Sequence, residues 1–251
     1  MMRILVLLRG MLAALVIGLL SGSVVAASVD AEAAIKAKFK TSLPQLKIVG
    51  IEETMAPGIY AVALKSGEEL MTSADGSFIF SGDLLAVQAR GIVNISEKKR
   101  GVKRAKALSA LNDDDLVVYQ AEGEEKGQVL AFTDTSCGYC QKFHKEIPAL
   151  NKLGITVKYV AWPRYGLQSP AGKVIADVWC AKDRAKAMTM AKTRRSVGET
   201  LAACDLSSII QDQIALGRLM GVKGTPALFG VDGRQLGGYR KASDLAKEFG
   251  I

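Results

Sequence analysis

Two cysteines three positions apart, Cys137 and Cys140, constrain the fold of this 251-residue chain more than any other feature. Residues 128–133 before them form an apolar run typical of a buried strand, and residues 139–153 after them have a helical pattern. A disulfide between residues this close can form only where the backbone folds back tightly, as it does in the first turn of a helix. The spacing therefore predicts an α/β domain with the pair where a strand passes into a helix.

The position of each cysteine predicts its chemical role. A helix N-terminus offers free backbone N–H groups and a partial positive charge, and both stabilise a thiolate. The pKa of Cys137 is therefore expected to be low, which makes it the nucleophile of thiol–disulfide exchange. Cys140 is expected to be buried one turn further on and to resolve mixed disulfides by attacking Cys137. Gly138 and Tyr139 complete the predicted active-site motif.

A structural zinc site and an ordinary structural disulfide are the alternatives for such a motif. Structural zinc takes four Cys or His ligands, commonly from paired motifs of this spacing. The other cysteines are 24 positions apart, and His144 is the one histidine of the chain. We therefore predict no metal and no cofactor. His144 lies one helical turn after Cys140, and the sequence leaves open whether it tunes the site or is a partly exposed helix residue.

The N-terminus has the layout of a cleaved signal peptide over residues 1–27. Arg3 and Arg9 precede an apolar run, and small residues follow it up to Ala27. A membrane anchor is the alternative, but the apolar core is shorter than the ~20 residues of a span. Cleavage removes two arginines, so the net charge falls from +8 to +6. A basic run at residues 98–106 is interpreted as a solvated helix face, because export separates the chain from nucleic acid.

Cys180 and Cys204 ask for a different explanation from the first pair. In an exported chain disulfides persist, so an even cysteine count favours pairing. A structural disulfide within a helical region is predicted for this pair, and a second redox pair is the alternative.

The segment after residue 27 is predicted to be a small α+β domain. A helix is expected over residues 28–40, and a meander of short strands over residues 46–51, 59–64, 69–72, 77–80 and 84–88, separated by turn signals such as Asp75-Gly76. So small a sheet leaves edges exposed, which favours association with a second copy.

Residues 94–112 predict a helix that links this domain to the next. Asn94 and Glu97 resemble a capping box, and an apolar stripe recurs at Val102, Ala105 and Leu108. The opposite face is basic, so we expect a linker rather than a core element.

The remaining chain alternates strands and helices. A strand is expected at residues 155–161, helices over residues 169–217 opened by Ser169-Pro170, a hairpin at residues 227–231 and 235–239, and a final helix after Ser243.

Three segments together resemble the thioredoxin fold: the strand before the motif, Cys-Gly-Tyr-Cys itself, and the distant Gly224-Thr225-Pro226-Ala227. With the signal peptide, the small N-terminal domain, the linker helix and the second cysteine pair, the whole segment 28–251 resembles the DsbC/DsbG family. The run Trp179-Cys180-Ala181-Lys182-Asp183 is most similar to the DsbC branch.

The resemblance implies a periplasmic disulfide isomerase, with a cystatin-like N-terminal dimerisation domain at residues 28–94, a linker helix at 95–115 and a thioredoxin-like catalytic domain with a helical insertion at 116–251. It implies a homodimer, chaperone-like binding of misfolded exported proteins, and reduction by a membrane thiol reductase of the DsbD type. Thr225 and Pro226 would form a substrate-binding cis-proline loop beside Cys137. Thioredoxin carries a buried acid where this chain has Ala131, so the proton acceptor of Cys140 stays unassigned.

Two further activities are alternatives to isomerisation. A DsbG-like protein would reduce sulfenic acids and act as a chaperone, and a DsbA-type protein would oxidise dithiols. The dipeptide between the two cysteines, Gly138-Tyr139, and the second cysteine pair favour the DsbC branch over DsbG. A DsbA-type oxidase is disfavoured because it does not need an N-terminal association domain.

Overall fold

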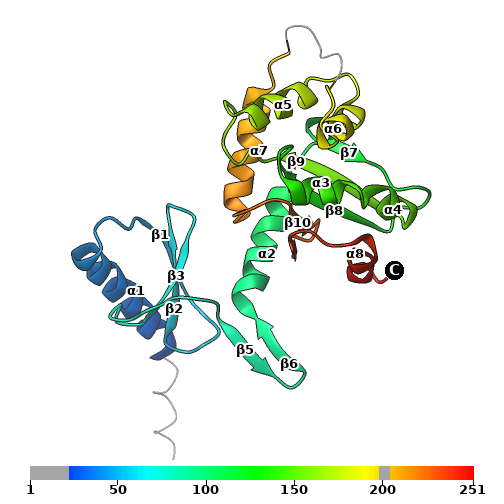
Figure 1. The fold of residues 1–251 in the computed structure, drawn as a ribbon. Coiled ribbons are helices and arrows are strands. Elements are labelled where there is room, and N and C mark those ends of the chain that lie inside the picture. Colours follow the sequence, from blue (N-terminus) through cyan, green and yellow to red (C-terminus); the bar gives the residue numbers. More distant parts are fainter. Residues whose placement is uncertain (1–22, 198–203) are drawn as a thin grey trace, which may run out of the picture. The chain divides into compact units, whose positions relative to one another are not determined.

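The computed structural model describes residues 23–197 and 204–251, so most of the predicted signal peptide lies outside the described residues. The chain divides into two compact units, the first ending at Gly82 and the second beginning at Asp83 (Figure 1). Within the described ranges, no helix is both long enough and apolar enough to cross a membrane.

The first unit is a helix packed on an antiparallel sheet. Helix α1 (Ser23–Ser42) is followed by strands β1 (Ile48–Glu53), β2 (Ile59–Leu64), β3 (Glu69–Ser73) and β4 (Ile79–Phe80). The strands pair in chain order, each antiparallel to the next, which confirms a meander for these four.

The core of this unit lies between α1 and the sheet. Ile35 and Phe39 of the helix pack against Tyr60 and Val62 of β2, and all four side chains are buried. The turn between β3 and β4 contacts the helix through Gly76, which has a φ of +70°. A Cβ there would lie 3.2 Å from the Cα of Ile35, so both the backbone conformation and the close approach require glycine.

The prediction that residues 84–88 continue the meander is wrong. Strand β5 (Leu85–Gln88) pairs instead with β6 (Gly91–Asn94), a strand that the sequence did not predict, and the hairpin falls in the second unit. Gly82 stands between β4 and β5 with a φ of +126°, a conformation that lets the chain leave the first sheet.

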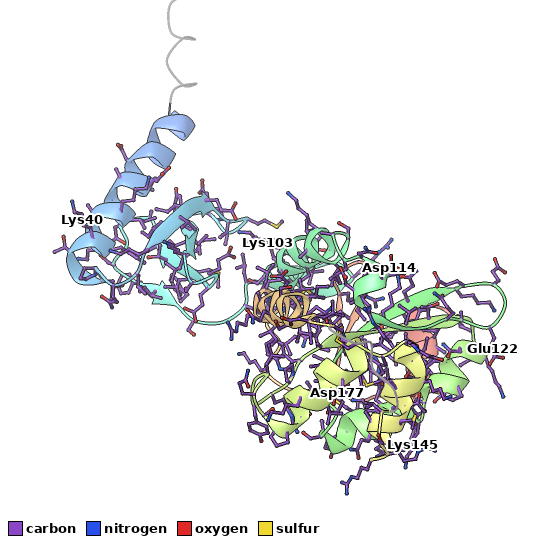
Figure 2. The ribbon with its side chains drawn as sticks, turned by 90° about the horizontal axis from the view of Figure 1, so that it is seen from above. Lys40, Lys103, Asp114, Glu122, Lys145 and Asp177 are labelled. Atoms are coloured by element: carbon purple, nitrogen blue, oxygen red, sulfur yellow. A yellow bond between two sulfur atoms is a disulfide. The ribbon has the colours of Figure 1, made fainter. Side chains whose placement is uncertain are left out.

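Helix α2 (Ile95–Leu108) starts at the predicted cap, but its buried face differs from the predicted stripe. The Asn94 side chain accepts a hydrogen bond from the Glu97 backbone N–H at 2.8 Å, while the Glu97 carboxylate binds arginines rather than returning to the cap. Val102 is 68% exposed, whereas Arg104 is 6% exposed. Lys103 lies on the exposed face of this helix (Figure 2).

Arg104 can be buried because its guanidinium makes three contacts: an ion pair, a hydrogen bond and a contact with an aromatic ring. Its Nη1 lies 2.5 Å from a Glu97 carboxylate oxygen and donates to the Gly233 carbonyl at 3.5 Å, and the guanidinium carbon sits 5.5 Å from the centre of the Phe229 ring. Leu108 at the end of the helix is also buried, in the same hydrophobic cluster as Phe229. The end of α2 is therefore part of the core of the second unit, contrary to the prediction of a helix outside it.

The second unit is built on a five-stranded mixed sheet in the order β11-β10-β8-β9-β7. The strands are β7 (Val117–Tyr119), β8 (Gly127–Thr133), β9 (Ile155–Ala161), β10 (Ala227–Gly230) and β11 (Gln235–Gly237). β8 and β9 are parallel, and the other pairs are antiparallel. The sequence predicted all of these strands except β7.

The two faces of the sheet are covered by different helices. Val129 and Ala131 of β8 belong to a hydrophobic cluster that includes α3 to α6 and α8, while Leu130 and Phe132 belong to one that includes the end of α2. Because side chains alternate along a strand, the two clusters lie on opposite faces. This three-layer arrangement is the predicted thioredoxin-like fold (Figure 1).

The helix predicted over residues 139–153 is two helices, α3 (Gly138–His144) and α4 (Ile147–Lys152). Pro148 is the physical reason. It has no N–H to donate, and its ring clashes with the carbonyl one turn earlier in a continuous helix. In the first turn of a new helix neither matters, and Pro148 occupies that position in α4.

In the described part of the stretch between β9 and β10 lie three helices, α5 (Pro170–Trp179), α6 (Arg184–Lys192) and α7 (Ser207–Leu219), and α8 (Ala242–Glu248) follows β11. Ser169 caps α5 as predicted, accepting a hydrogen bond from the Gly172 N–H at 3.0 Å. Cys180 and Cys204 form a disulfide with a Cα–Cα distance of 5.8 Å. Helix α6 therefore lies inside the loop that this disulfide closes.

Candidate active site

Cys137 and Cys140 lie where β8 passes into α3. Cys137 is the N-cap residue of α3, with an extended backbone, and Cys140 is inside the first turn. Both are free thiols and both are buried, at 4% and 0% exposed. Gly138 is the first residue of the helix, and Tyr139 is 65% exposed beside the pair.

The surroundings of Cys137 favour its thiolate. Burial on its own raises the pKa of Cys137, but hydrogen bonds from the Thr225 hydroxyl and from Cys140, with the positive charge of Arg164, outweigh it and lower the pKa. The bond from the Cys140 backbone N–H is one that a helix N-terminus leaves free. The structure thus places Cys137 in the environment of a nucleophile.

Cys140 has the opposite environment. Burial raises its pKa above the ordinary value, and this outweighs the positive charge of Lys192 and hydrogen bonds from Asp134, Thr133 and Thr225. The two thiols therefore differ in the direction of their pKa shifts although three positions separate them. A thiol with a raised pKa needs a partner that takes its proton before it can attack.

Thr225 and Pro226 lie directly against Cys137. The peptide bond between them is cis, and the Cys137 thiol donates to the Thr225 carbonyl at 3.2 Å. The Thr225 hydroxyl is buried and makes no hydrogen bond to an oxygen or nitrogen of the described residues, so it is available to the thiolates of the pair. Pro226 then leads into β10, whose first residue pairs with Phe132 of β8.

An ion pair that the sequence did not predict, between the buried Asp134 and the exposed Arg164, lies beside the motif. Asp134 is fully buried, and its carboxylate accepts from the Ser136 N–H at 2.7 Å, the Arg164 N–H at 2.9 Å and the Arg164 Nε at 3.3 Å. Burial would raise the pKa of Asp134, but these bonds and the charge of Arg164 lower it. Asp134 therefore stays ionised and holds Arg164 near Cys137.

Lys192, at the end of α6, is a second group that the sequence did not predict. It is 4% exposed, and its Nζ donates to Thr133 Oγ1 at 2.6 Å and to the Asp134 carbonyl at 2.8 Å. Burial lowers the pKa of Lys192 to about 8. One signal could have found it: Lys192 follows Met188 by one turn, on the apolar face of its helix.

His144 is a buried part of the core rather than an exposed helix residue. Its Nδ1 lies 3.2 Å from the Tyr159 hydroxyl and its Nε2 lies 3.1 Å from Thr189 Oγ1. Burial and the charge of Lys192 lower its pKa to about 4, so the imidazole is neutral at pH 7.

Across the described ranges, no group of three or more His, Cys, Asp and Glu side chains is arranged to hold a metal ion.

Comparisons with known proteins place the chain in a family. The family described as disulfide bond isomerase protein N-terminal domain matches residues 26–97, and the thioredoxin-like domain family matches residues 113–250. The thiol:disulfide interchange protein DsbC of Escherichia coli is 38% identical over 204 residues, which is 81% of each chain. The chain belongs to the DsbC family. DsbC of Haemophilus influenzae is 32% identical over 218 residues, 86% of this chain and 89% of that protein.

A solved structure supports the fold. A linker-deleted variant of ScsC from Proteus mirabilis superposes with a TM-score of 0.51 and 19% identity, over 61% of this chain and 84% of that one. The family and the fold predicted from the sequence are thus confirmed, and so is the class of enzyme, a thioredoxin-fold protein of thiol:disulfide interchange.

Proposed function

We propose that this chain is a disulfide isomerase that rearranges wrong disulfides in exported proteins, with Cys137 as the nucleophile. One observation carries the proposal: the pKa of Cys137 is lowered while that of Cys140 is raised within the same motif. Cys137 is then available as a thiolate while Cys140 stays protonated, which suits an exchange reaction in which Cys137 attacks and Cys140 resolves.

The first step forms a mixed disulfide. The Cys137 thiolate attacks one sulfur of a substrate disulfide, the substrate S–S bond breaks, and its other sulfur leaves as a thiolate. A second substrate thiolate then attacks the substrate sulfur of the mixed disulfide and releases Cys137 as a thiolate. Disulfides are rearranged with no net transfer of electrons, so the enzyme leaves reduced.

Cys140 provides the exit when rearrangement stalls. Its thiolate attacks the sulfur of Cys137, the bond from Cys137 to the substrate breaks, and the substrate leaves as a thiolate. The substrate gains two electrons and the enzyme is oxidised to the disulfide between Cys137 and Cys140. A thiol:disulfide reductase must then return two electrons, and a membrane protein of the DsbD type is the proposed donor.

Thr225 and Pro226 are the proposed contact for the substrate backbone. The Thr225 carbonyl lies 3.2 Å from the Cys137 sulfur, so a chain joined to that sulfur passes beside it. Tyr139 adds an exposed aromatic flank, with its ring centre 6.3 Å from that of Tyr239. These groups offer backbone and apolar contacts, which suit substrates of many sequences.

The N-terminal part is proposed to make a homodimer, with boundaries at residues 28–94 for the dimerisation domain, 95–115 for the linker and 116–251 for the catalytic domain. Exposed apolar side chains on each unit support association: Phe78 of the first unit is 67% exposed, and Val87 and Ile92 on the β5–β6 hairpin of the second unit are 87% and 70% exposed. A dimer would place two catalytic domains around one unfolded chain, which also accounts for chaperone-like binding.

Export through the signal peptide at residues 1–27 is proposed to bring the chain to the periplasm, where disulfides persist. The relatives named above are DsbC proteins, and no observation favours a DsbG-like sulfenic acid reductase or a DsbA-type oxidase.

Refolding of a scrambled multi-disulfide protein tests the proposal. The reduced mature chain is expected to restore native activity and Cys137→Ser is expected to restore none, because the nucleophile is missing. Recovery with both proteins, or oxidation of a reduced substrate without any isomerisation, would contradict the proposal.

A further inference from the structure

A lysine in the core of the second unit lies beside the redox pair, and no carboxylate of the described residues forms an ion pair with it. The two hydrogen bonds of Lys192 go to uncharged oxygens, Thr133 Oγ1 at 2.6 Å and the Asp134 carbonyl at 2.8 Å. A neutral amine has two N–H groups and one lone pair, so Lys192 can donate to the Asp134 carbonyl and, at 2.6 Å, either donate to the Thr133 hydroxyl or accept from it. Burial lowers the pKa of Lys192 to about 8, so at pH 7 roughly a tenth of the molecules hold the neutral amine, and this fraction grows as the pH rises.

Thr133 connects this amine to the resolving cysteine. It is fully buried at the end of β8, its Oγ1 lies 2.6 Å from Lys192 Nζ, and its hydroxyl is near enough to the Cys140 sulfur to favour the thiolate by lowering the pKa of Cys140. A hydroxyl both donates and accepts, so it can pass a proton between two neighbours. The positive charge of Lys192 also favours the Cys140 thiolate, and the thiolate in turn favours the ammonium.

The other groups near Cys140 are unsuited to take its proton. β8 has Ala131 facing the core where a carboxylate would be needed. Asp134 is held ionised by its own hydrogen bonds and Arg164. His144 is engaged at both ring nitrogens, by Tyr159 and Thr189.

We propose that Lys192 takes the proton of the Cys140 thiol, through the Thr133 hydroxyl, when Cys140 attacks the mixed disulfide. This inference rests on the proposed function, because it concerns the resolving step of that exchange. Lys192 thus supplies the proton acceptor that the sequence left unassigned.

The step balances as follows. The Cys140 S–H bond breaks, its proton goes to Thr133 Oγ1, and the Thr133 hydroxyl proton goes to the Lys192 lone pair. The Cys140 thiolate forms a bond to the Cys137 sulfur, and the bond from Cys137 to the substrate sulfur breaks. The substrate leaves as a thiolate, the cysteine pair is oxidised, and Lys192 holds one proton.

The proton on Lys192 has a route to water. Lys192 lines a hollow of about 330 Å³ whose other walls are Gly138, Gln141, Lys142, Lys145, Thr193 and Arg194. Lys145 is exposed at this rim (Figure 2). Lys142, Lys145 and Arg194 make the wall of this hollow basic.

The charged and titratable groups that face Lys192 come from four parts of the fold. They are Cys137, Cys140 and His144 at α3, Asp134 after β8, Tyr159 on β9 and Arg164 after β9. Asp134 and the thiolates favour the ammonium while Arg164 disfavours it.

Two-phase release of nitrothiobenzoate separates attack from resolution. The reduced chain is mixed with excess dithionitrobenzoate: attack by Cys137 releases the first equivalent, and resolution by Cys140 releases the second. Lys192→Met is expected to slow the second phase at pH 7 at least ~10-fold, a modest value for loss of a general base. The first phase is expected to change less than about twofold, since Cys137 does not use this acceptor.

The pH profile separates proton acceptance from a structural role. In Lys192→Met the second phase is expected to rise with pH until it approaches the wild-type rate, because hydroxide then deprotonates Cys140 directly. Thr133→Val, which keeps volume but removes the hydroxyl, is expected to slow the same phase. Lys186→Met makes the same substitution at an exposed site on α6 and should leave both phases unchanged.

Lys192→Arg tests charge against proton acceptance, because arginine stays protonated. A second phase as slow in Lys192→Arg as in Lys192→Met supports the proposal. A wild-type second phase in Lys192→Met or in Lys192→Arg overturns it, as does a deficit that is the same at every pH. Absence of a second phase in the wild type would instead overturn the proposed role of Cys140, and with it the function on which this inference rests.

Discussion

The disulfide between Cys180 and Cys204 is predicted to stabilise the second unit by about 3.5 kcal/mol. The bond closes a loop with a sequence separation of 24. For a loop of that size the chain-entropy relation gives about 3.5 kcal/mol of lost freedom in the unfolded chain. Replacement of both cysteines by alanine should therefore raise the equilibrium constant of unfolding about 300-fold.

Tryptophan fluorescence can measure this loss of stability in the second unit alone. Trp162 and Trp179 are the two tryptophans of the protein and both lie in the second unit. Trp179 is fully buried and precedes Cys180, so its fluorescence reports unfolding around the disulfide. With a urea dependence of about 2 kcal/mol/M, the unfolding midpoint should fall by about 1.7 M.

The control keeps the redox pair out of the comparison. Parent and variant both carry Cys137→Ser and Cys140→Ser, so only one disulfide differs between them. Added reductant should bring the parent to the midpoint of the variant. A shift equivalent to less than about 1 kcal/mol would refute the reasoning, because the loop would then not restrict the unfolded chain as the relation requires.

Three further predictions concern single residues. Arg164→Met should raise the pKa of Cys137, because the substitution removes the guanidinium charge that stabilises its thiolate. A titration followed by thiolate absorbance that does not move to higher pH would contradict this. Arg104→Ala should lower the free energy of unfolding by about 2 kcal/mol, since hydrogen bonds to charged groups contribute about 1.5–3 kcal/mol; the same urea titration measures it, and an unchanged midpoint would contradict it. His144 has a pKa of about 4 when folded against 6.5 ordinarily, so the unfolded chain binds more protons between these values and stability should fall as pH drops through that window. His144→Gln should flatten that slope in urea titrations at several pH values, and an identical slope would contradict it.

The sequence was most informative where function depends on local geometry. Cysteines three apart, placed after an apolar strand, predicted the helix N-terminus at Cys137, and Ser169-Pro170 predicted the start of α5. The four-strand meander followed from turn signals such as Asp75-Gly76. In each case a few neighbouring residues determine the backbone, so the pattern is visible without the fold.

The errors arose where a residue's partners lie far away in the chain. Arg104 was placed on a solvated basic face, but Phe229 and Gly233 provide it with a buried site. Lys192 meets Thr133 across 59 positions of sequence, and only the folded sheet brings them together. The break at Pro148 is the exception, because it is visible locally: proline in a helix interior lacks an N–H and clashes with the carbonyl one turn earlier.

Trapping of mixed disulfides tests the division of roles between the two cysteines most directly. Cys140→Ser and Cys137→Ser are each incubated with a scrambled multi-disulfide protein, and adducts are mapped by mass spectrometry after quenching with acid. Cys140→Ser is predicted to accumulate substrate joined to Cys137, because the attacking thiolate remains and the resolving thiol is gone. Cys137→Ser is predicted to form almost no adduct. Comparable amounts of adduct in both variants, with substrate joined to Cys140 in the second, would contradict the account.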